Sequence, residues 1–421
     1  MATFDVSRLD RFAGTSTSIR RPREFTYFSF DDEHHLKPLS SESLSYYYPP
    51  IFGAPGAQEP RPDLSAGFQT FKQRDDSVDE HLEGLLDTLQ AHEEQLLEKV
   101  QRGEGTVADV RSRADFVTWR GMMTKILTVA FDDFSDFEMI ATCFQGTIFI
   151  EENHSYKAAQ QRSQNSQQPR RGEAPQELMQ FWGLSRCSVD HITDHPADYW
   201  QGYKFEAIST LPTTWAESIR EAIEARDSNI VNNHPQYCSI VRTGIGTSTL
   251  ILAGEVDAVL GEKPDDPNTP IPWVELKTTA EPGNLSIPRE AVKYERKLMR
   301  YWAQSFLLGV PKVIVGYRTP DGFLKRIVEL ETQKLPGMVK RGQHTWDGNV
   351  CINLTAAFLE FLKEVVGSEE GGVWRIRRRR NGRVIEVLKV EQTGTGEVLK
   401  PSFKAHRERL RGLEISAALG K

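Results

Sequence analysis

Hydrophobic residues recur along this chain with two different periods, which predict helices in some segments and strands in others. Within residues 79–101, leucines recur every three or four positions among charged residues, as on a helix with one apolar side. Residues 250–260 instead form an almost continuous apolar run, as in a buried strand. Both patterns alternate along the sequence, so we expect a chain that mixes helices and strands.

The same criteria applied to the whole chain predict an α+β protein. Strands are expected at residues 21–30, 137–151 (a pair that turns at Gly146), 203–211, 237–242, 250–260, 271–279, 312–318, 324–330, 373–380 and 383–390. Helices are expected at residues 79–101, 107–131, 215–226, 288–308 and 354–366. Turn signals at Pro320-Asp321-Gly322 and Asn381-Gly382 predict two hairpins. This order favours a mixed sheet covered by helices.

Three segments depart from these patterns and suggest the domain limits. Residues 1–20 are polar and are expected to be a flexible N-terminus. Residues from about 158 to 175 are rich in Gln, Ser, Asn and Arg and are expected to form a disordered insertion. Residues 401–421 are expected to be a C-terminal tail. One domain, at residues 21–400, is predicted between the two ends.

Two short acidic segments interrupt the apolar strands, Gly254-Glu255-Val256-Asp257 and Trp273-Val274-Glu275-Leu276-Lys277. Alternate residues of a strand share a face, so Glu255 should lie beside Asp257 and Glu275 beside Lys277. Charged side chains are seldom buried in such strands without a partner. Three carboxylates and one ammonium on adjacent strands could hold a divalent metal for phosphodiester hydrolysis. They could equally form salt bridges between strands, and the pattern alone does not decide.

The ligand type determines which ion such a site would prefer. Carboxylate oxygens without Cys or His ligands suit magnesium or manganese better than zinc. The four cysteines contain no CxxC pair, which also argues against structural zinc. A bound ion would polarise a phosphoryl oxygen and lower the pKa of water, and Lys277 would orient that water or stabilise the developing negative charge. The pattern resembles that of the PD-(D/E)xK nucleases.

Composition narrows the class of protein without naming a partner. The chain has 421 residues and a formal net charge of -7, so it carries no global nucleic-acid signature. A local basic channel beside acidic metal ligands would be invisible in this sum. No apolar segment approaches the roughly 18 residues that span a bilayer, and the N-terminus does not resemble a signal peptide. We expect an intracellular protein with free thiols and no membrane partner.

Five short motifs follow one another in an order that resembles the DXO family of decapping nucleases. They are Trp119-Arg120-Gly121, Gly202-Tyr203-Lys204-Phe205-Glu206, the two acidic segments, and Gln304-Ser305-Phe306-Leu307-Leu308-Gly309-Val310-Pro311. The resemblance extends from about Arg23 to about Val390. It implies a single bilobed domain with two mixed β-sheets flanked by helices and a PD-(D/E)xK nuclease-like core.

The resemblance also implies roles for individual residues. The implied metal ligands are Glu206, Glu255, Asp257, Glu275 and the main-chain carbonyl of Leu276. The implied catalytic residues are Glu206, Glu255, Asp257, Glu275 and Lys277. The implied substrate contacts are Arg23, Glu80, Arg120, Cys238, Glu255, Lys277 and Gln304, with loose local motifs around Arg23 and Glu80. Plainer interpretations stay open: Glu206 and Arg120 could form ion pairs, Gln304 could be solvated, and Cys238 could be a small buried residue.

The function implied by the resemblance is quality control of RNA 5′ ends. Expected substrates are 5′-triphosphate RNA, incompletely methylated caps and NAD caps, and the expected cofactor is Mg or Mn. Fungal members of the family include the partner that activates the nuclear 5′-3′ exoribonuclease, which implies that exoribonuclease as a partner and the nucleus, with the cytoplasm as an alternative. The basic run Arg377-Arg378-Arg379-Arg380 is weak local support for nuclear import. Alternatives are a cytoplasmic-type enzyme with its own distributive 5′-3′ exoribonuclease activity, or a non-catalytic exonuclease-binding partner.

Overall fold

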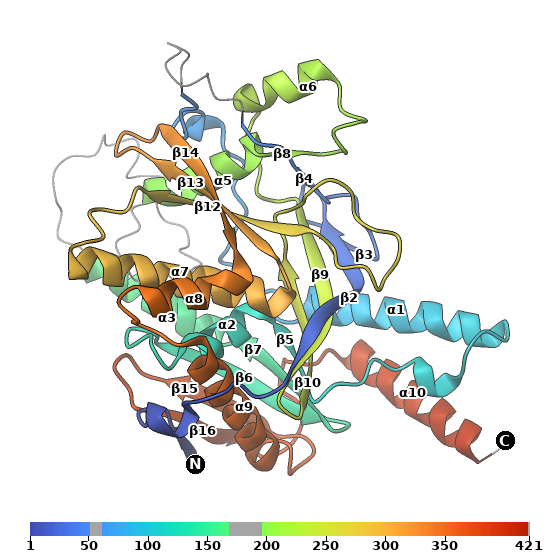
Figure 1. Ribbon diagram of the computed structural model, residues 1–421. Helices are drawn as coiled ribbons and strands as arrows, with labels where there is room; N and C mark the ends of the chain where they lie inside the picture. Colours follow the sequence, from blue (N-terminus) through green and yellow to red (C-terminus); the bar gives the residue numbers. More distant parts are fainter. Residues whose placement is uncertain (51–60, 168–195, 420–421) are drawn as a thin grey trace.

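The structure, a computed structural model, describes residues 1–50, 61–167 and 196–419 and contains two mixed β-sheets, which confirms the α+β class (Figure 1). Listed in spatial order, the large sheet consists of β1 (Ala2–Asp5), β16 (Val384–Glu391), β15 (Val373–Arg378), β6 (Phe137–Phe144), β7 (Thr147–Glu152), β5 (Phe116–Trp119), β10 (Ser248–Glu255), β9 (Gln236–Ile245), β2 (Ile19–Phe30) and β3 (Leu36–Pro38). The small sheet consists of β14 (Leu324–Glu331), β13 (Lys312–Arg318), β12 (Trp273–Ala280), β11 (Ala258–Val259), β4 (Tyr46–Tyr47) and β8 (Thr210–Leu211).

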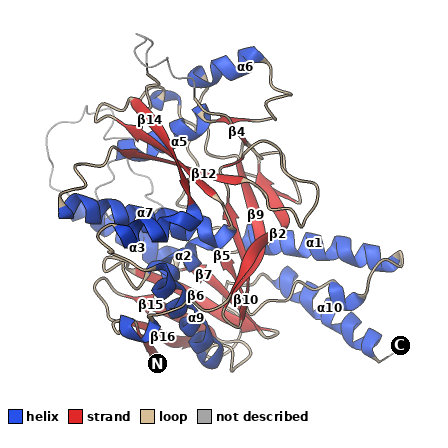
Figure 2. Ribbon diagram, in the orientation of Figure 1, coloured by secondary structure: helices blue, strands red, loops and turns tan. Residues whose placement is uncertain are grey.

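Helices pack on both faces of the large sheet (Figure 2). The helices are α1 (Glu83–Gln101), α2 (Arg120–Thr128), α3 (His154–Gln167), α5 (Pro196–Ile208), α6 (Arg220–Glu224), α7 (Pro288–Leu308), α8 (Leu335–Arg341), α9 (Gly348–Val365) and α10 (Pro401–Ala418). Helices α2, α7 and α9 share the largest core with one face, and α1 and α10 cover the other. Along β10, alternate residues enter these two cores, as a strand buried on both sides requires. Helix α5 packs on the small sheet.

Helix α7 has the bounds that the sequence predicts, and local chemistry explains both ends. Pro288 occupies the first turn, where its missing N–H costs no hydrogen bond. Gly309 follows the last turn with φ 74°, a left-handed conformation that glycine adopts without strain. The predicted hairpins also form, with Asn381 at φ 56° between β15 and β16. Such local signals were sufficient because a turn depends on its own few residues.

Regular structure occurs at both ends of the described chain: strand β1 lies within the predicted flexible N-terminus (residues 1–20), and helix α10 within the predicted C-terminal tail (residues 401–421), whose last two residues lie outside the described ranges. Strand β1 pairs with β16, which places Phe4 opposite Ile385 and against Phe358. Helix α10 packs on α1, where Phe403 joins the core below the sheet. Neither arrangement could be predicted from the local sequence, because each terminal segment is stabilised by partners that are hundreds of residues away in the chain. Of the predicted insertion at 158–175, the part up to Gln167 is helical in α3, and the remainder lies outside the described residues.

Three internal predictions are wrong in the type or continuity of the element. Residues 116–119, predicted within a helix, form β5, which pairs in parallel with β7 and β10. Residues 203–208, predicted as a strand, belong to helix α5, where Phe205 and Ile208 are buried three positions apart. The predicted strand at 250–260 divides into β10 and β11, one in each sheet. Apolar runs this short fit either element, and the tertiary partner decides. Among the described residues, none of the helices combines the length and apolar composition that crossing a bilayer requires.

Candidate active site

The acidic residues meet where the chain passes from the large sheet to the small one. Strand β10 ends at Glu255, and Asp257 lies in the short link before β11. Strand β11 pairs with β12, with Ala258 opposite Val274, so Glu275 follows directly beside the link. The predicted proximity of the two acidic segments is confirmed, but β10 and β12 are joined through β11 rather than paired directly. Glu206 reaches the group from α5, not from a strand.

Glu275 is the most strongly paired acid of this group. Its side chain is 1% exposed, and its two oxygens bind different cations: Lys277 Nζ lies 2.7 Å from Oε1, and Arg120 Nη1 lies 3.3 Å from Oε2. Burial would raise the pKa of Glu275, but the charges of Lys277 and Arg120 outweigh it and lower the pKa. The predicted pairing of Glu275 with Lys277 on one strand face is confirmed.

Three further carboxyl groups are half-buried beside Glu275 without enough positive charge to balance them. Burial and the charge of Glu275 raise the pKa of Asp257 to about 7, although Asp257 Oδ2 accepts a 2.6 Å hydrogen bond from the N–H of Leu276. Burial and the neighbouring charges of Asp257 and Glu255 raise the pKa of Glu206 well above its ordinary value. Burial also raises the pKa of Glu255, despite attraction from Arg74. The site is therefore an acidic, electrostatically strained cluster.

Such a cluster fits a divalent cation. Buried carboxylates that repel one another are stabilised when a hard cation binds between them, and oxygen ligands without thiolate or imidazole suit Mg²⁺ or Mn²⁺. Four carboxylates and the Leu276 carbonyl supply oxygens only. The four carboxylates are not gathered as tightly as in a closed ligand set, since Glu275 is directed to Lys277 and Arg120. Oxygen chemistry and unbalanced charge both support the predicted cofactor.

A tighter group of possible ligand atoms occurs elsewhere in the described part of the chain. The side chains of Asp31, Glu33 and His35 place three such atoms within 4.8 Å of one another on the turn between β2 and β3. The carboxylate of Asp31 is already used: it accepts the N–H groups of Glu33 and His35 and pairs with Lys37 at 3.2 Å. Asp31 therefore stabilises the turn, and the group does not alter the assignment of the acidic cluster.

Arg120 is held beside the acids by the absence of a side chain at Gly254. A Cβ atom on Gly254 would lie 2.9 Å from Leu308 Cδ1 and 3.0 Å from Arg120 Cβ, both too close. Gly254 thus lets the start of α2 and the end of α7 approach β10. Gln304 lies one turn before Leu308 on α7, so both project toward the end of β10. Gln304 is half-buried there, and its contact with substrate stays a prediction.

Two more predicted residues border the cluster, and one does not. Cys238 lies opposite Glu255 in the β9–β10 pair and is buried, which raises the pKa of its thiol. Glu80 accepts a 2.8 Å hydrogen bond from His34. Arg23 lies opposite Arg242, four residues further along β9 than Cys238, or roughly 13 Å away. The structure therefore places Arg23 outside this cluster, and its guanidinium lies 3.5 Å from the amide oxygen of Asn268.

Residues that the sequence analysis did not single out complete the site. Arg74 donates to Gln236 Oε1 at 3.2 Å and lies 4.0 Å from Glu80, while Gln236 donates to Glu255 at 3.2 Å. His34 stacks on Phe30 with ring centroids 4.0 Å apart. Arg74 sits in a charged segment that reads as a solvated loop, and His34 sits in a turn, so neither carried a local signal. Only the fold brings them to the acids.

Comparison with known proteins agrees with this geometry. The chain matches the RAI1 like PD-(D/E)XK nuclease family over residues 20–404. It is 47% identical to Decapping nuclease RAI1 of Emericella nidulans, over 96% of this chain and 98% of that one, and 48% identical to its namesake from Aspergillus fumigatus, over 97% and 99%. The human Decapping and exoribonuclease protein is 32% identical over 85% of this chain and 78% of its own.

Two solved structures share the fold across nearly the whole chain. Candida albicans Rai1 in complex with pU5-Mn2+ has a TM-score of 0.77 at 25% identity, covering 97% of this chain and 100% of that one. Scheffersomyces stipitis Rai1 in complex with (3'-NADP)+ and calcium ion has a TM-score of 0.78 at 26% identity, with the same coverage. Both relatives therefore bind a divalent cation together with a nucleotide or oligonucleotide.

Proposed function

We propose, on the premise that this chain belongs to the RAI1 like PD-(D/E)XK nuclease family, that it is a hydrolytic enzyme that removes aberrant 5′ ends from RNA. The observation that carries the proposal is the group of half-buried Glu206, Glu255 and Asp257 with buried Glu275 around Lys277. Keeping so many carboxyl groups together is unfavourable without bound cations. A purely structural role would not require this arrangement.

A divalent ion held by Glu206, Glu255, Asp257, Glu275 and the Leu276 carbonyl would polarise a phosphoryl oxygen and lower the pKa of a water molecule. Lys277, whose pKa is raised above its ordinary value because the attraction of Glu275 outweighs burial, stays protonated and stabilises negative charge on the phosphoryl group. Arg120 binds a phosphate beside it, as a planar guanidinium can through two N–H groups. Cys238 forms part of the cleft wall.

The bond that breaks sets the product. Water oxygen bonds to phosphorus while the bond from that phosphorus to the leaving oxygen breaks. On 5′-triphosphate RNA, attack at the first phosphorus releases pyrophosphate and leaves a 5′-monophosphate. On an incompletely methylated cap, attack at the first phosphodiester linkage releases a cap dinucleotide. NAD caps belong to the same substrate class, and the S. stipitis relative in complex with (3'-NADP)+ supports that extension.

The proposal includes a protein partner, a nuclear 5′-3′ exoribonuclease, and a nuclear location, with the cytoplasm as an alternative. The structure weakens the case that the basic run at residues 377–380 is a nuclear import signal. Arg378 is buried and donates to the carbonyls of Asp132 and Ser135, and Arg377 pairs with Glu386. Arg379 donates a hydrogen bond to the hydroxyl of Tyr156. Three of the four arginines are thus engaged within the fold, so the location rests on the family alone.

A second candidate activity is distributive 5′-3′ exoribonuclease digestion by this chain itself. The human relative, named Decapping and exoribonuclease protein, favours it. The same carboxylates would serve both reactions, because each is water attack on a phosphate diester or anhydride. A non-catalytic exonuclease-binding protein is the remaining alternative.

One assay separates these activities. RNA carrying a 5′-triphosphate or an unmethylated cap, labelled at both ends, is incubated with the protein and Mn²⁺ or Mg²⁺. Pyrophosphate or cap dinucleotide release indicates 5′-end hydrolysis, and progressive shortening indicates exonuclease activity. Glu275→Gln should abolish both, while Glu329→Gln, an exposed glutamate on β14 that pairs with Lys312, should leave them unchanged. Hydrolysis that persists in chelator, or that survives in Glu275→Gln, would refute the metal assignment.

A further inference from the structure

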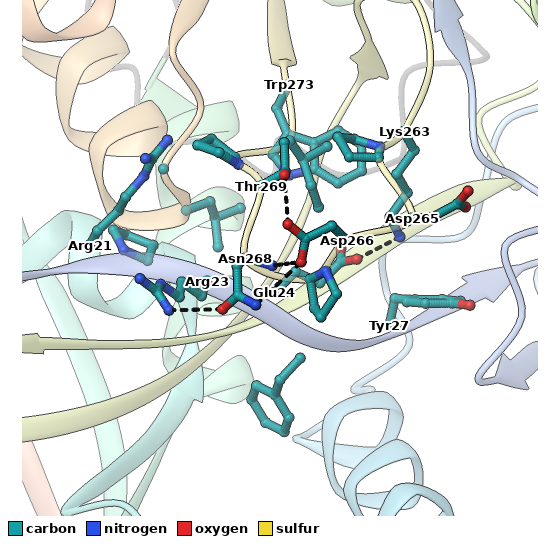
Figure 3. Close-up of a pocket in the computed structure, with 18 of the residues that line it drawn as sticks. Arg21, Arg23, Glu24, Tyr27, Lys263, Asp265, Asp266, Asn268, Thr269 and Trp273 are labelled. Carbon is teal, nitrogen blue, oxygen red and sulfur yellow. Dashed lines mark hydrogen bonds and ion pairs between the residues drawn. The ribbon is translucent and has the colours of Figure 1, made fainter.

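A cavity of about 470 Å³ is lined by Tyr27, Lys263 and Trp273 among others (Figure 3). Tyr27 lies opposite Ser239 in the β2–β9 pair, so the cavity is on the other face of β9 from Cys238 and Glu255. Tyr237, next to Cys238 on that strand, points to the cavity side, where its hydroxyl accepts a hydrogen bond from Lys263 at 2.7 Å. The walls come from β2, the loop at residues 263–271, β4, the start of β12 and the end of α7. None of the hydrolytic roles proposed above uses this cavity.

The β2 side of the cavity is an open sheet edge. Strand β2 pairs with β9 between Ile19 and Phe30, with bulges between Arg20 and Arg23 and between Glu24 and Thr26, and on its other side β3 pairs only with residues 28–30. The end of α7 packs beside Pro22, where a Cβ on Gly309 would lie 3.3 Å from Pro22 Cβ and 3.4 Å from the Pro22 carbonyl oxygen. Within the described ranges, no strand covers the outer edge of residues 19–25. Open edges of this kind present unpaired N–H and C=O groups to another polypeptide. Pro22 lies within the open part, as is usual for edge strands.

The exposed charges along this edge are positive and unbalanced. Arg21 and Arg23 are exposed, and in the part of the chain that the structure describes neither lies within 4.0 Å of a carboxylate oxygen. The acids around the cavity are already engaged. Glu24 pairs with Lys263 at 2.5 Å, and Asp266 accepts hydrogen bonds from Asn268 and Thr269. Asp265 points away from both arginines in Figure 3.

We propose that this edge and cavity form a docking surface for an extended, acidic segment of a protein partner. The partner segment would run along the outer edge of β2 and pair with the backbone groups that the bulges and the end of α7 leave open, and its acidic side chains would face Arg21 and Arg23. RNA phosphates would also be attracted to the arginines, but they cannot match alternating backbone donors and acceptors. The aromatic side chains of Tyr27, Tyr46 and Trp273 supply the apolar wall for a partner side chain. The alternative is that this edge binds no partner, and that Pro22 and the arginines only prevent pairing between the edges of two copies of the chain.

The test uses the full-length protein and labelled peptides of about eight residues, long enough to lie along the open edge. The first probe alternates Glu and Val, the second alternates Lys and Val, and the third is the Glu-Val peptide with alternate backbone nitrogens methylated. Binding is measured by fluorescence anisotropy at low salt. The Glu-Val peptide should bind, and the other two should bind at least about tenfold more weakly, because one loses the charge match and the other the backbone donors.

Arg21→Glu/Arg23→Glu should weaken Glu-Val binding by about tenfold or more. The matched control, Arg289→Glu/Arg341→Glu, makes the same charge change at two exposed arginines elsewhere and should have no effect. Should the charge-reversed protein fail to fold, Arg21→Gln/Arg23→Gln should still weaken binding several-fold. Equal binding of the methylated peptide, or no peptide binding, would overturn the proposal. So would an Arg21→Glu/Arg23→Glu protein that loses RNA affinity but keeps peptide affinity. Hydrolysis is measured separately, so failure of the proposed enzymatic function would not alter the peptide result.

Discussion

Glu93 offers a sharp test of the contact between α1 and the C-terminal helix α10. Its side chain is completely buried, accepts hydrogen bonds from the N–H of Ser112 at 2.7 Å and from His406 at 2.9 Å, and forms an ion pair with Arg407 at 2.9 Å. Glu93→Ala would leave the buried Arg407 guanidinium without its counter-charge. Breaking a buried pair in this way costs about 3–5 kcal/mol of unfolding free energy.

The measurement is urea unfolding at pH 7, followed by circular dichroism. Glu94→Ala is the matched control, because Glu94 is 47% exposed and contacts the same His406 from the solvent side at 3.6 Å. It should cost less than about 1 kcal/mol. In a double-mutant cycle, Arg407→Met should recover part of the loss, with a coupling energy of about 1–3 kcal/mol. A loss below about 1 kcal/mol for Glu93→Ala, or additive effects in the cycle, would refute the reasoning.

Three other predictions follow from the structure. Burial would raise the pKa of Glu152, but Lys125 and Lys157 lower it from 4.5 to about 2. Its contribution of about 3.5 kcal/mol to stability is complete above about pH 4.5 and is lost as the pH falls through 2. Urea unfolding should therefore show Glu152→Gln destabilised at pH 7 and progressively less so in acid; a pH-independent difference would contradict this. Gly309→Ala should lose about 1–2 kcal/mol in the same assay, because φ is 74° and a Cβ would meet Pro22 at 3.3 Å, and an unchanged midpoint would contradict the argument. Mn²⁺ at about 100 times its Kd should stabilise the wild type by about 2.7 kcal/mol in thermal melts, and chelator should reverse this gain. The Asp257→Asn variant should not be stabilised. Equal stabilisation of both proteins would show that the ion binds elsewhere.

Structural features with local causes could be predicted from the sequence. The bounds of α7 follow from Pro288 and Gly309, and the hairpin between β15 and β16 follows from Asn381-Gly382. The pairing of Glu275 with Lys277 follows from their spacing on one strand. The order of the five motifs was enough to indicate the family. Each of these inferences depends on residues close together in the chain, where local geometry leaves few alternatives.

Features with distant partners could not be predicted in this way. Glu206 reaches the cluster from a helix, because the side chains of Phe205 and Ile208 pack on the small sheet, and the same short apolar pattern had fitted a strand. Arg74 and His34 carried no local signal, and Arg23, which the family resemblance implied as a substrate contact through a loose local motif, lies along β2 away from the acids.

The sequence by itself thus determined the residue types of the site and, through the order of the five motifs, the family, while the strand spacing alone fitted metal binding and salt bridges equally. Only the tertiary structure decided which side chains complete the site. The site lies where the large and small sheets meet, between β10 and β12, and α2 and α5 add residues from other parts of the chain. The physical reason is that burial and charge balance belong to the packed structure: a carboxylate such as Asp257 acquires its raised pKa only when folding removes water and places Glu275 beside it.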